Sequence, residues 1–131
     1  MRLTFVAVVL AVVACGTSST LQPRLQPRLE QPFTLGLDQT AEFPDLQLEI
    51  TFRSVPSDSR CPRTVVCVWA GSAEVRLEVT VRDQVRSIVV NTGVEPREAV
   101  IGSRRLVLRT LSPEPPLRPT DYRVTLELQP L

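Results

Sequence analysis

From residue 33 to residue 128 the chain repeatedly alternates apolar and polar side chains with a period of two. The clearest examples are residues 46–52, 75–81 and 122–128, where an apolar residue occupies every second position. A segment of this kind forms a β-strand with one buried face and one solvated face. No stretch of comparable length has helical spacing, so the sequence predicts a fold built from strands.

Weaker segments of the same kind are residues 33–37, 64–70, 85–92 and 105–111. The turns expected between strands are residues 82–84, 91–93, 101–103 and 113–119. About seven short strands with one apolar face each can bury those faces only by forming two sheets that cover each other. The sequence therefore predicts an all-β fold, an antiparallel β-sandwich of about seven strands that is immunoglobulin-like in size.

Two cysteines close together in the chain, Cys61 and Cys67, form a candidate disulfide. The chain must reverse between them for the sulfurs to meet, and Pro62 suits such a turn. In an exported domain a structural disulfide is favoured over a redox pair or a soft-metal site, since reactive pairs are usually spaced Cys-x-x-Cys. Trp69 is then expected to pack against the bridge in the core, and Gly71 is expected to mark a bulge in one long strand.

The N-terminal residues 1–14 begin with Met-Arg and continue as an apolar run that is too short to span a bilayer but fits a secretory signal peptide. Residues 12–15 read Val-Val-Ala-Cys and resemble the lipobox of bacterial lipoproteins. That resemblance implies cleavage before Cys15, a diacylglyceryl group on its sulfur and acylation of the new amino terminus. With Gly16 following, it also implies the outer membrane in a bacterium that has two membranes. The alternative is an ordinary secretory cleavage site that leaves Cys15 as a spare thiol.

Residues 15–32 are rich in Ser, Thr, Gln and Pro, and they repeat Leu-Gln-Pro-Arg at 21–24 and 25–28. Each proline removes a backbone donor and disfavours helix in the residue before it. The segment is therefore predicted to be a lipid anchor followed by a solvated Pro-rich tether, in preference to a partner-binding Pro-rich motif. Residues 33–131 are predicted to form the β-sandwich domain.

Residues 58–62 read Asp-Ser-Arg-Cys-Pro, and residues 67–71 read Cys-Val-Trp-Ala-Gly. Together with the lipobox and a single β domain, this pattern resembles a group of small bacterial lipoproteins to which no activity is assigned. The resemblance covers residues 33–128. It implies an exported β domain at the bacterial cell envelope that contacts the membrane through lipid on Cys15, and it points to no particular activity.

The composition excludes several functional classes. The chain has no His, which removes the usual general base and the commonest metal ligand. Its 15 basic residues nearly balance its 14 acidic residues, so no charged surface for nucleic acid is expected. Asp58 is expected to cap its own turn or to pair with Arg60, in preference to holding Ca²⁺ with another Asp. We therefore expect no enzyme, no metal and no cofactor.

Two hypotheses about binding remain. The first is a tethered interaction or structural module that meets an unknown envelope protein or ligand. The second is a protease-inhibitor-like protein in which the closed Cys61–Cys67 loop presents Arg63 rigidly. If the domain binds a partner, Asp58, Arg60 and Arg63 are the candidate binding residues, because binding residues concentrate on loops held by rigid elements.

Overall fold

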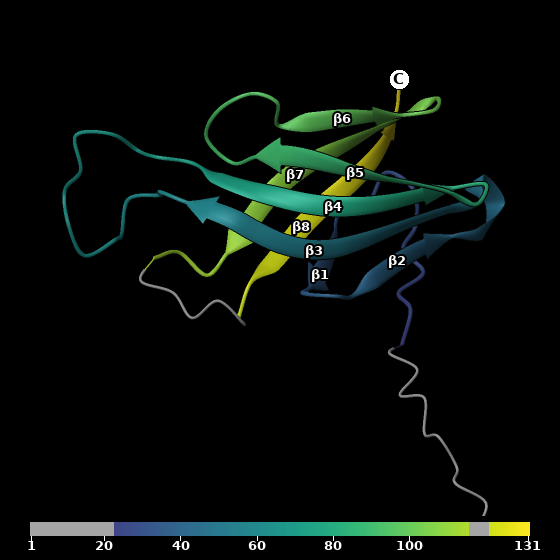
Figure 1. Cartoon of the computed structure of the whole chain (residues 1–131), viewed down its shortest axis with the longest axis horizontal. Coiled ribbons are helices and arrows are strands. Elements are labelled where there is room, and N and C mark those ends of the chain that lie inside the picture. Colours follow the sequence, from purple (N-terminus) through teal and green to yellow (C-terminus); the bar gives the residue numbers. More distant parts are fainter. Residues whose placement is uncertain (1–22, 116–120) are drawn as a thin grey trace, which may run out of the picture.

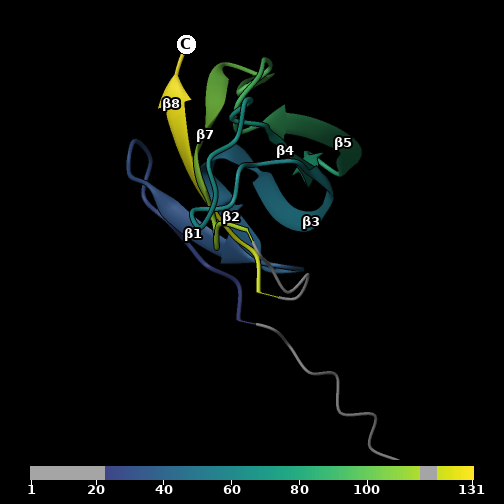
Figure 2. The same ribbon diagram turned by 90° about the vertical axis from the view of Figure 1, so that its left-hand side faces the viewer.

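The computed structural model describes residues 23–115 and 121–131, and the predicted signal peptide and Cys15 lie outside this part of the chain. The elements in chain order are β1 (Phe33–Gly36), β2 (Thr40–Phe43), the 3-10 turn η1 (Pro44–Leu46), β3 (Leu48–Asp58), β4 (Ala73–Val81), β5 (Gln84–Asn91), β6 (Glu98–Ile101), β7 (Arg104–Ser112) and β8 (Arg123–Pro130). One four-stranded sheet has the order β2-β3-β4-β5, and the other has the order β1-β8-β7-β6. All of these strand pairs are antiparallel. Figures 1 and 2 show the two sheets as layers that cover each other, which confirms the predicted β-sandwich.

The period-two pattern places the apolar residues of both sheets in one core. The largest fully buried side chains from the first sheet are Ile50, Phe52, Val75, Leu77, Val79 and Val90, and those from the second are Leu35, Leu106, Val124, Leu126 and Leu128. Between them on the strands, residues such as Glu74 and Arg76 are exposed. Full burial of one large apolar side chain contributes about 1.5–3 kcal/mol, so this pattern fixes which face of each strand points inward.

Two hairpins form at turns that the sequence predicts. In the β4–β5 turn, Arg82 and Asp83 have φ of 46° and 67°, and the flanking residues Val81 and Gln84 pair across the turn. In the β6–β7 turn, Gly102 has φ of 60° between the paired residues Ile101 and Arg104. Left-handed backbone at a two-residue turn matches the twist of the flanking strands.

The strand predictions need two corrections. Residues 64–70 form no strand, although Thr64, Val65 and Val66 are typical strand residues. They lie in a loop where no second layer covers them, and strand propensity depends mainly on such packing. Conversely, the four-residue strands β2 and β6 are absent from the strands that the sequence predicts.

The Pro-rich segment is not wholly solvated over its described part, residues 23–32. Leu25 forms a parallel bridge with Ala41 of β2, in which its N–H donates to the carbonyl of Thr40 at 2.9 Å. Its carbonyl accepts from the N–H of Glu42 at 2.7 Å. An edge strand offers unpaired backbone groups, and an extended chain can satisfy them. The segment therefore covers the free edge of β2 before it enters β1.

Candidate functional site

The β3–β4 loop, residues 59–72, projects beyond both sheets at one end of the sandwich (Figure 1). The loop follows an irregular part of β3, in which the pairing register with β4 shifts twice between Phe52 and Ser57. Pro56 lies in this stretch and cannot donate to the ladder. Bulges of this kind bend a strand, and here pairing with β4 resumes at Ser57 and Asp58 before the loop begins.

Hydrogen bonds between its two arms close the base of the loop. The N–H of Ser59 donates to the carbonyl of Ser72 at 2.8 Å, and the N–H of Cys61 donates to the carbonyl of Ala70 at 2.9 Å. The Ser59 hydroxyl also accepts from the N–H of Ser72 at 3.1 Å. The two arms therefore continue the pairing of β3 and β4 past the ends of the strands.

Gly71 makes this closure sterically feasible. Its φ is +70°, and a Cβ atom at this position would lie 1.7 Å from the carbonyl oxygen of Ser59. Only glycine permits both the left-handed backbone and so close an approach. The bulge predicted at Gly71 is wrong, because β4 begins only at Ala73 and Gly71 lies in the loop, outside any strand.

A disulfide between Cys61 and Cys67 closes the outer part of the loop, with the two Cα atoms 5.9 Å apart. This confirms the predicted pairing. Constraining a short loop reduces the conformations open to the unfolded chain and, in the folded protein, the conformations of the loop itself.

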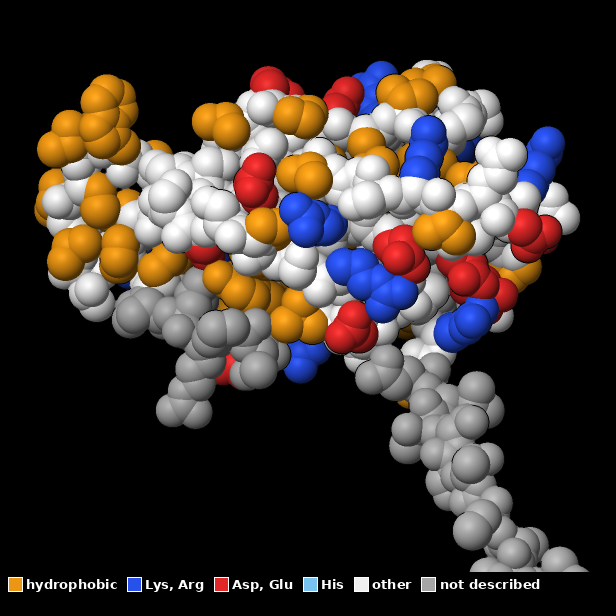
Figure 3. Space-filling model, viewed as in Figure 1, with side chains coloured by type: hydrophobic (Ala, Val, Ile, Leu, Met, Phe, Trp, Pro, Cys, Tyr) orange, Lys and Arg blue, Asp and Glu red, His pale blue; other side chains and the backbone are white. Residues whose placement is uncertain are grey.

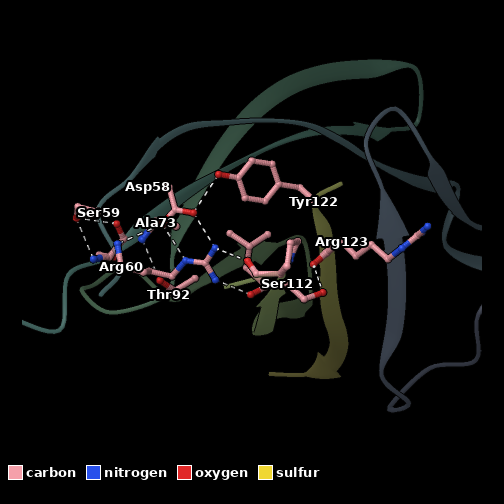
Figure 4. A network of polar contacts seen from close by, with 11 residues as sticks. Asp58, Ser59, Arg60, Ala73, Thr92, Ser112, Tyr122 and Arg123 are labelled. Carbon is pink, nitrogen blue, oxygen red and sulfur yellow. Dashed lines mark hydrogen bonds and ion pairs between the residues drawn. The ribbon is translucent and has the colours of Figure 1, made fainter. Parts of the chain in front are cut away.

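Asp58 and Arg60 form a bidentate ion pair at the base of the loop (Figure 4). The Arg60 Nε donates to Asp58 Oδ1 at 2.8 Å, and Arg60 Nη2 donates to Asp58 Oδ2 at 2.7 Å. The Arg60 side chain is 12% exposed and that of Asp58 is 9% exposed. The planar guanidinium matches the carboxylate at both positions, which is the strongest geometry for such a pair.

The pair also connects the loop to the second sheet. Arg60 Nη1 donates to the carbonyl of Leu111 at 2.6 Å, and Nη2 donates to the carbonyl of Pro113 at 2.8 Å. The Tyr122 hydroxyl, just before β8, donates to Asp58 Oδ2 at 3.0 Å. Asp58 and Arg60 are candidate binding residues from the sequence, but in the structure their charged groups bond to partners within the domain.

The surroundings of these groups shift their pKa values. Burial alone would raise the pKa of Asp58 from its ordinary 3.8, but hydrogen bonds from Arg60 and Tyr122 outweigh burial and lower it. The hydrogen bond to Asp58 raises the pKa of Arg60. The pKa of Tyr122 is raised from its ordinary 10.0, mainly by burial and to a smaller extent by the hydrogen bond to Asp58. All three shifts favour a charged Asp58–Arg60 pair beside a neutral Tyr122 at neutral pH.

Arg63 has a different environment. Its side chain is 80% exposed and pairs with Glu114, one contact being 3.2 Å from Nη2 to Oε1. Of the three predicted binding residues, only Arg63 is on the surface. The positive charge of Arg63 is paired with the carboxylate of Glu114.

The outer part of the loop is apolar and exposed. Val65, Val66, Val68 and Trp69, which we call the apolar tip, are 55%, 103%, 92% and 80% exposed. Figure 3 shows hydrophobic side chains gathered at the end of the molecule where this loop projects. The prediction that Trp69 packs in the core is wrong, because the chain re-enters the sandwich only at Ala73, four residues later.

The sequence contains a signal for this tip that strand pattern alone does not reveal. No Asp, Glu, Lys or Arg occurs in the ten residues from Thr64 to Ala73. Here the apolar residues include the adjacent pairs Val65–Val66 and Val68–Trp69 rather than a strict alternation. A half-buried strand would place charged or polar residues on its wet face, and this run does not.

Other features offer less to a ligand. Among the described residues, no group of three or more His, Cys, Asp or Glu could hold a metal ion. At the opposite end of the sandwich an open hollow of about 430 Å³ lies among η1 and the β4–β5 and β6–β7 turns. Its polar side chains include Asp45, Arg82 and Arg104. Within residues 23–115 and 121–131, no helix is long and apolar enough to cross a membrane.

Comparison with known proteins gives no family assignment. The chain matches no protein-family model, no curated protein and no solved structure.

Proposed function

We propose that this protein is a non-enzymatic binding module of the bacterial cell envelope that contacts its target through the apolar tip of the β3–β4 loop. In this proposal, lipid on Cys15 anchors the chain, and the β-sandwich holds the loop away from the Pro-rich segment. The observation that carries the proposal is the exposure of Val66, Val68 and Trp69 at the end of a disulfide-closed loop. Exposed apolar groups gathered in one place on a soluble surface commonly mark an interaction site.

The construction of the loop supports a binding role. Mobile groups that make a contact lose conformational entropy when they bind. The disulfide and the hydrogen-bonded arms already restrict the loop before binding, so less entropy is lost. Valine side chains add to this because they have few rotamers to lose. Trp is the residue type that most often dominates interface energies.

A residue-specific crosslink tests the surface. A photoreactive amino acid at Val66 in intact cells should capture the target, whereas the same group at Val85 should not. Val85 is 63% exposed and lies at the start of β5, at the opposite end of the molecule (Figure 1). Equal capture from both positions would contradict a loop-centred surface.

The proposed anchor has its own test. Mass spectrometry of the mature protein should find Cys15 acylated at the amino terminus, and Cys15→Ser should abolish that modification. A mature chain that begins at another residue, with an unmodified Cys15, would contradict lipid anchoring.

The protease-inhibitor-like alternative requires Arg63 to enter a protease pocket. The Arg63–Glu114 pair would have to open first, and this argues for the apolar tip over Arg63 as the contact. Titration against a trypsin-like protease separates the two ideas. Stoichiometric inhibition that Arg63→Ala abolishes would favour the alternative.

A further inference from the structure

The apolar tip has the chemistry of a lipid-contacting loop. It lies in the ten-residue stretch from Thr64 to Ala73, which contains no charged side chain. The hydrocarbon region of a bilayer strongly disfavours charge, whereas protein interfaces are enriched in Arg and tolerate charge at their rims. Arg63, the charged residue just before this stretch in sequence, forms an ion pair with Glu114.

The size of the tip also favours a lipid surface. A stable protein interface uses about 20–30 residues on each side. The apolar tip presents four exposed side chains on a projecting loop. A bilayer needs no matching shape, and a weak contact becomes effective when a second attachment holds the protein nearby.

The backbone of the loop sets how deeply it can enter. Residues 61–72 form neither helix nor strand, although the N–H of Cys61 donates to Ala70 and that of Val65 to Pro62. Irregular backbone is not tolerated in the lipid-exposed hydrocarbon core. It is compatible with the interfacial region, where Trp is the enriched side chain. Trp69 and the three valines therefore fit shallow insertion.

We propose that the target of this loop is the interfacial region of a lipid bilayer, into which Trp69, Val66 and Val68 insert. This inference rests on the proposed function, since it identifies the target of the same loop. Binding depends on apolar contact and not on lipid charge, because the tip carries no cationic group to attract anionic headgroups.

Trp69 itself reports the insertion, since it is the one Trp of the chain. The protein, purified from membranes and reconstituted in phosphatidylcholine vesicles, should show blue-shifted Trp69 emission. Bromine atoms on the lipid acyl chains should quench that emission by more than about half, with little change between low and high salt. This measurement reads the position of the loop, so an anchor that keeps the protein on the vesicle does not produce a false result.

A double variant separates insertion from anchoring. Val66→Ser with Val68→Ser should restore water-exposed Trp69 emission and remove most of the quenching, at an unchanged unfolding midpoint. Val85→Ser at the opposite end is the matched control and should leave the quenching unchanged.

One result would overturn the inference, and the crosslink then decides whether the proposed function survives. Trp69 that remains unquenched by brominated lipid, and accessible to an aqueous quencher, would show that the loop stays in water. If position 66 then crosslinks to a protein in cells, the inference fails but the proposed function stands with a protein target. If Trp69 stays unquenched and position 66 gives no specific crosslink, the inference and the proposed function both fail.

Discussion

At the scale of single residues, Arg60 and Arg63 lie three positions apart and have opposite environments. The Arg60 side chain is 12% exposed and bonds to Asp58 and two backbone carbonyls, whereas Arg63 is 80% exposed. Arg60→Ala leaves the Asp58 carboxylate buried without its cation and should cost about 3–5 kcal/mol of unfolding free energy. Arg63→Ala should cost less than about 0.5 kcal/mol. Urea denaturation of both variants measures the difference, and equal losses would contradict the structural role of Arg60.

Two glycines with left-handed backbone form a second matched pair. Gly71 has a φ of +70° and Gly102 a φ of +60°. A Cβ atom at Gly71 would collide with the Ser59 carbonyl, whereas a Cβ atom at Gly102 would have no other atom within 4 Å. Gly102→Ala should therefore cost only the conformational penalty, about 1 kcal/mol. Gly71→Ala must also open the base of the loop and should cost clearly more. Thermal unfolding of the two variants tests this, and a similar loss for both would show that the loop base relaxes freely.

Trp69 shows where residue-level prediction failed. The sequence places Cys67 and Trp69 on one face of a strand, and that inference holds only where a second layer covers the strand. The 80% exposure of Trp69 reverses the expected energetics. Trp69→Ala should change the unfolding free energy by less than about 0.5 kcal/mol, where a core Trp would cost about 3–5 kcal/mol. A core-like loss in chemical denaturation would contradict the exposed position.

At the scale of elements, the disulfide should act on the loop more than on the sheets. The Cys61→Ser and Cys67→Ser double variant should lose about 2 kcal/mol, as expected for a short closed loop. Hydrogen exchange should speed up within the β3–β4 loop, while the core strands β3, β4 and β8 keep their protection. Exchange that rises equally in both sheets would show that the bridge supports the whole domain.

The long strands and the short strand β1 were predictable from sequence, whereas the short strands β2 and β6 were not. The alternation in β4 and β8 extends over several residues and fixes the inward face, so the structure matches it at Val75, Leu77 and Leu126. Strands β2 and β6 depend on neighbours that are distant in sequence to complete their sheets. For the same reason the contact of Leu25 with β2 has no local signal, and the Pro-rich composition alone suggested a free tether.

At the scale of the whole molecule, the polar network beneath the loop joins the two sheets. Asp58 ends β3 of one sheet, while Leu111 and Tyr122 belong to or adjoin strands of the other. The sequence favours an Asp58–Arg60 pair because the two residues are neighbours. It cannot identify Tyr122 as a partner, since 64 residues separate Tyr122 from Asp58 and only the sandwich brings them together. The sequence therefore predicts the local Asp58–Arg60 contact but not the long-range partners that tie it to the second sheet.

This network should make the stability of the protein depend on acid. The pKa of Asp58 is lowered in the folded state, so its contribution is fully present above its ordinary value of 3.8 and is lost as pH falls through the folded value. Asp58→Asn removes the titrating group but leaves Arg60 without its anionic partner. The variant should therefore be much less stable than the natural protein at pH 7, and the difference in unfolding free energy should shrink as pH falls below about 4.

Tyr122→Phe is the matched control, because it removes one hydrogen bond at a cost of about 1–3 kcal/mol and keeps the ion pair. Urea denaturation between pH 7 and pH 2 measures all three proteins, and a difference between the natural protein and Asp58→Asn that stays constant over this range would show that Asp58 is not the acid-sensitive link between the sheets.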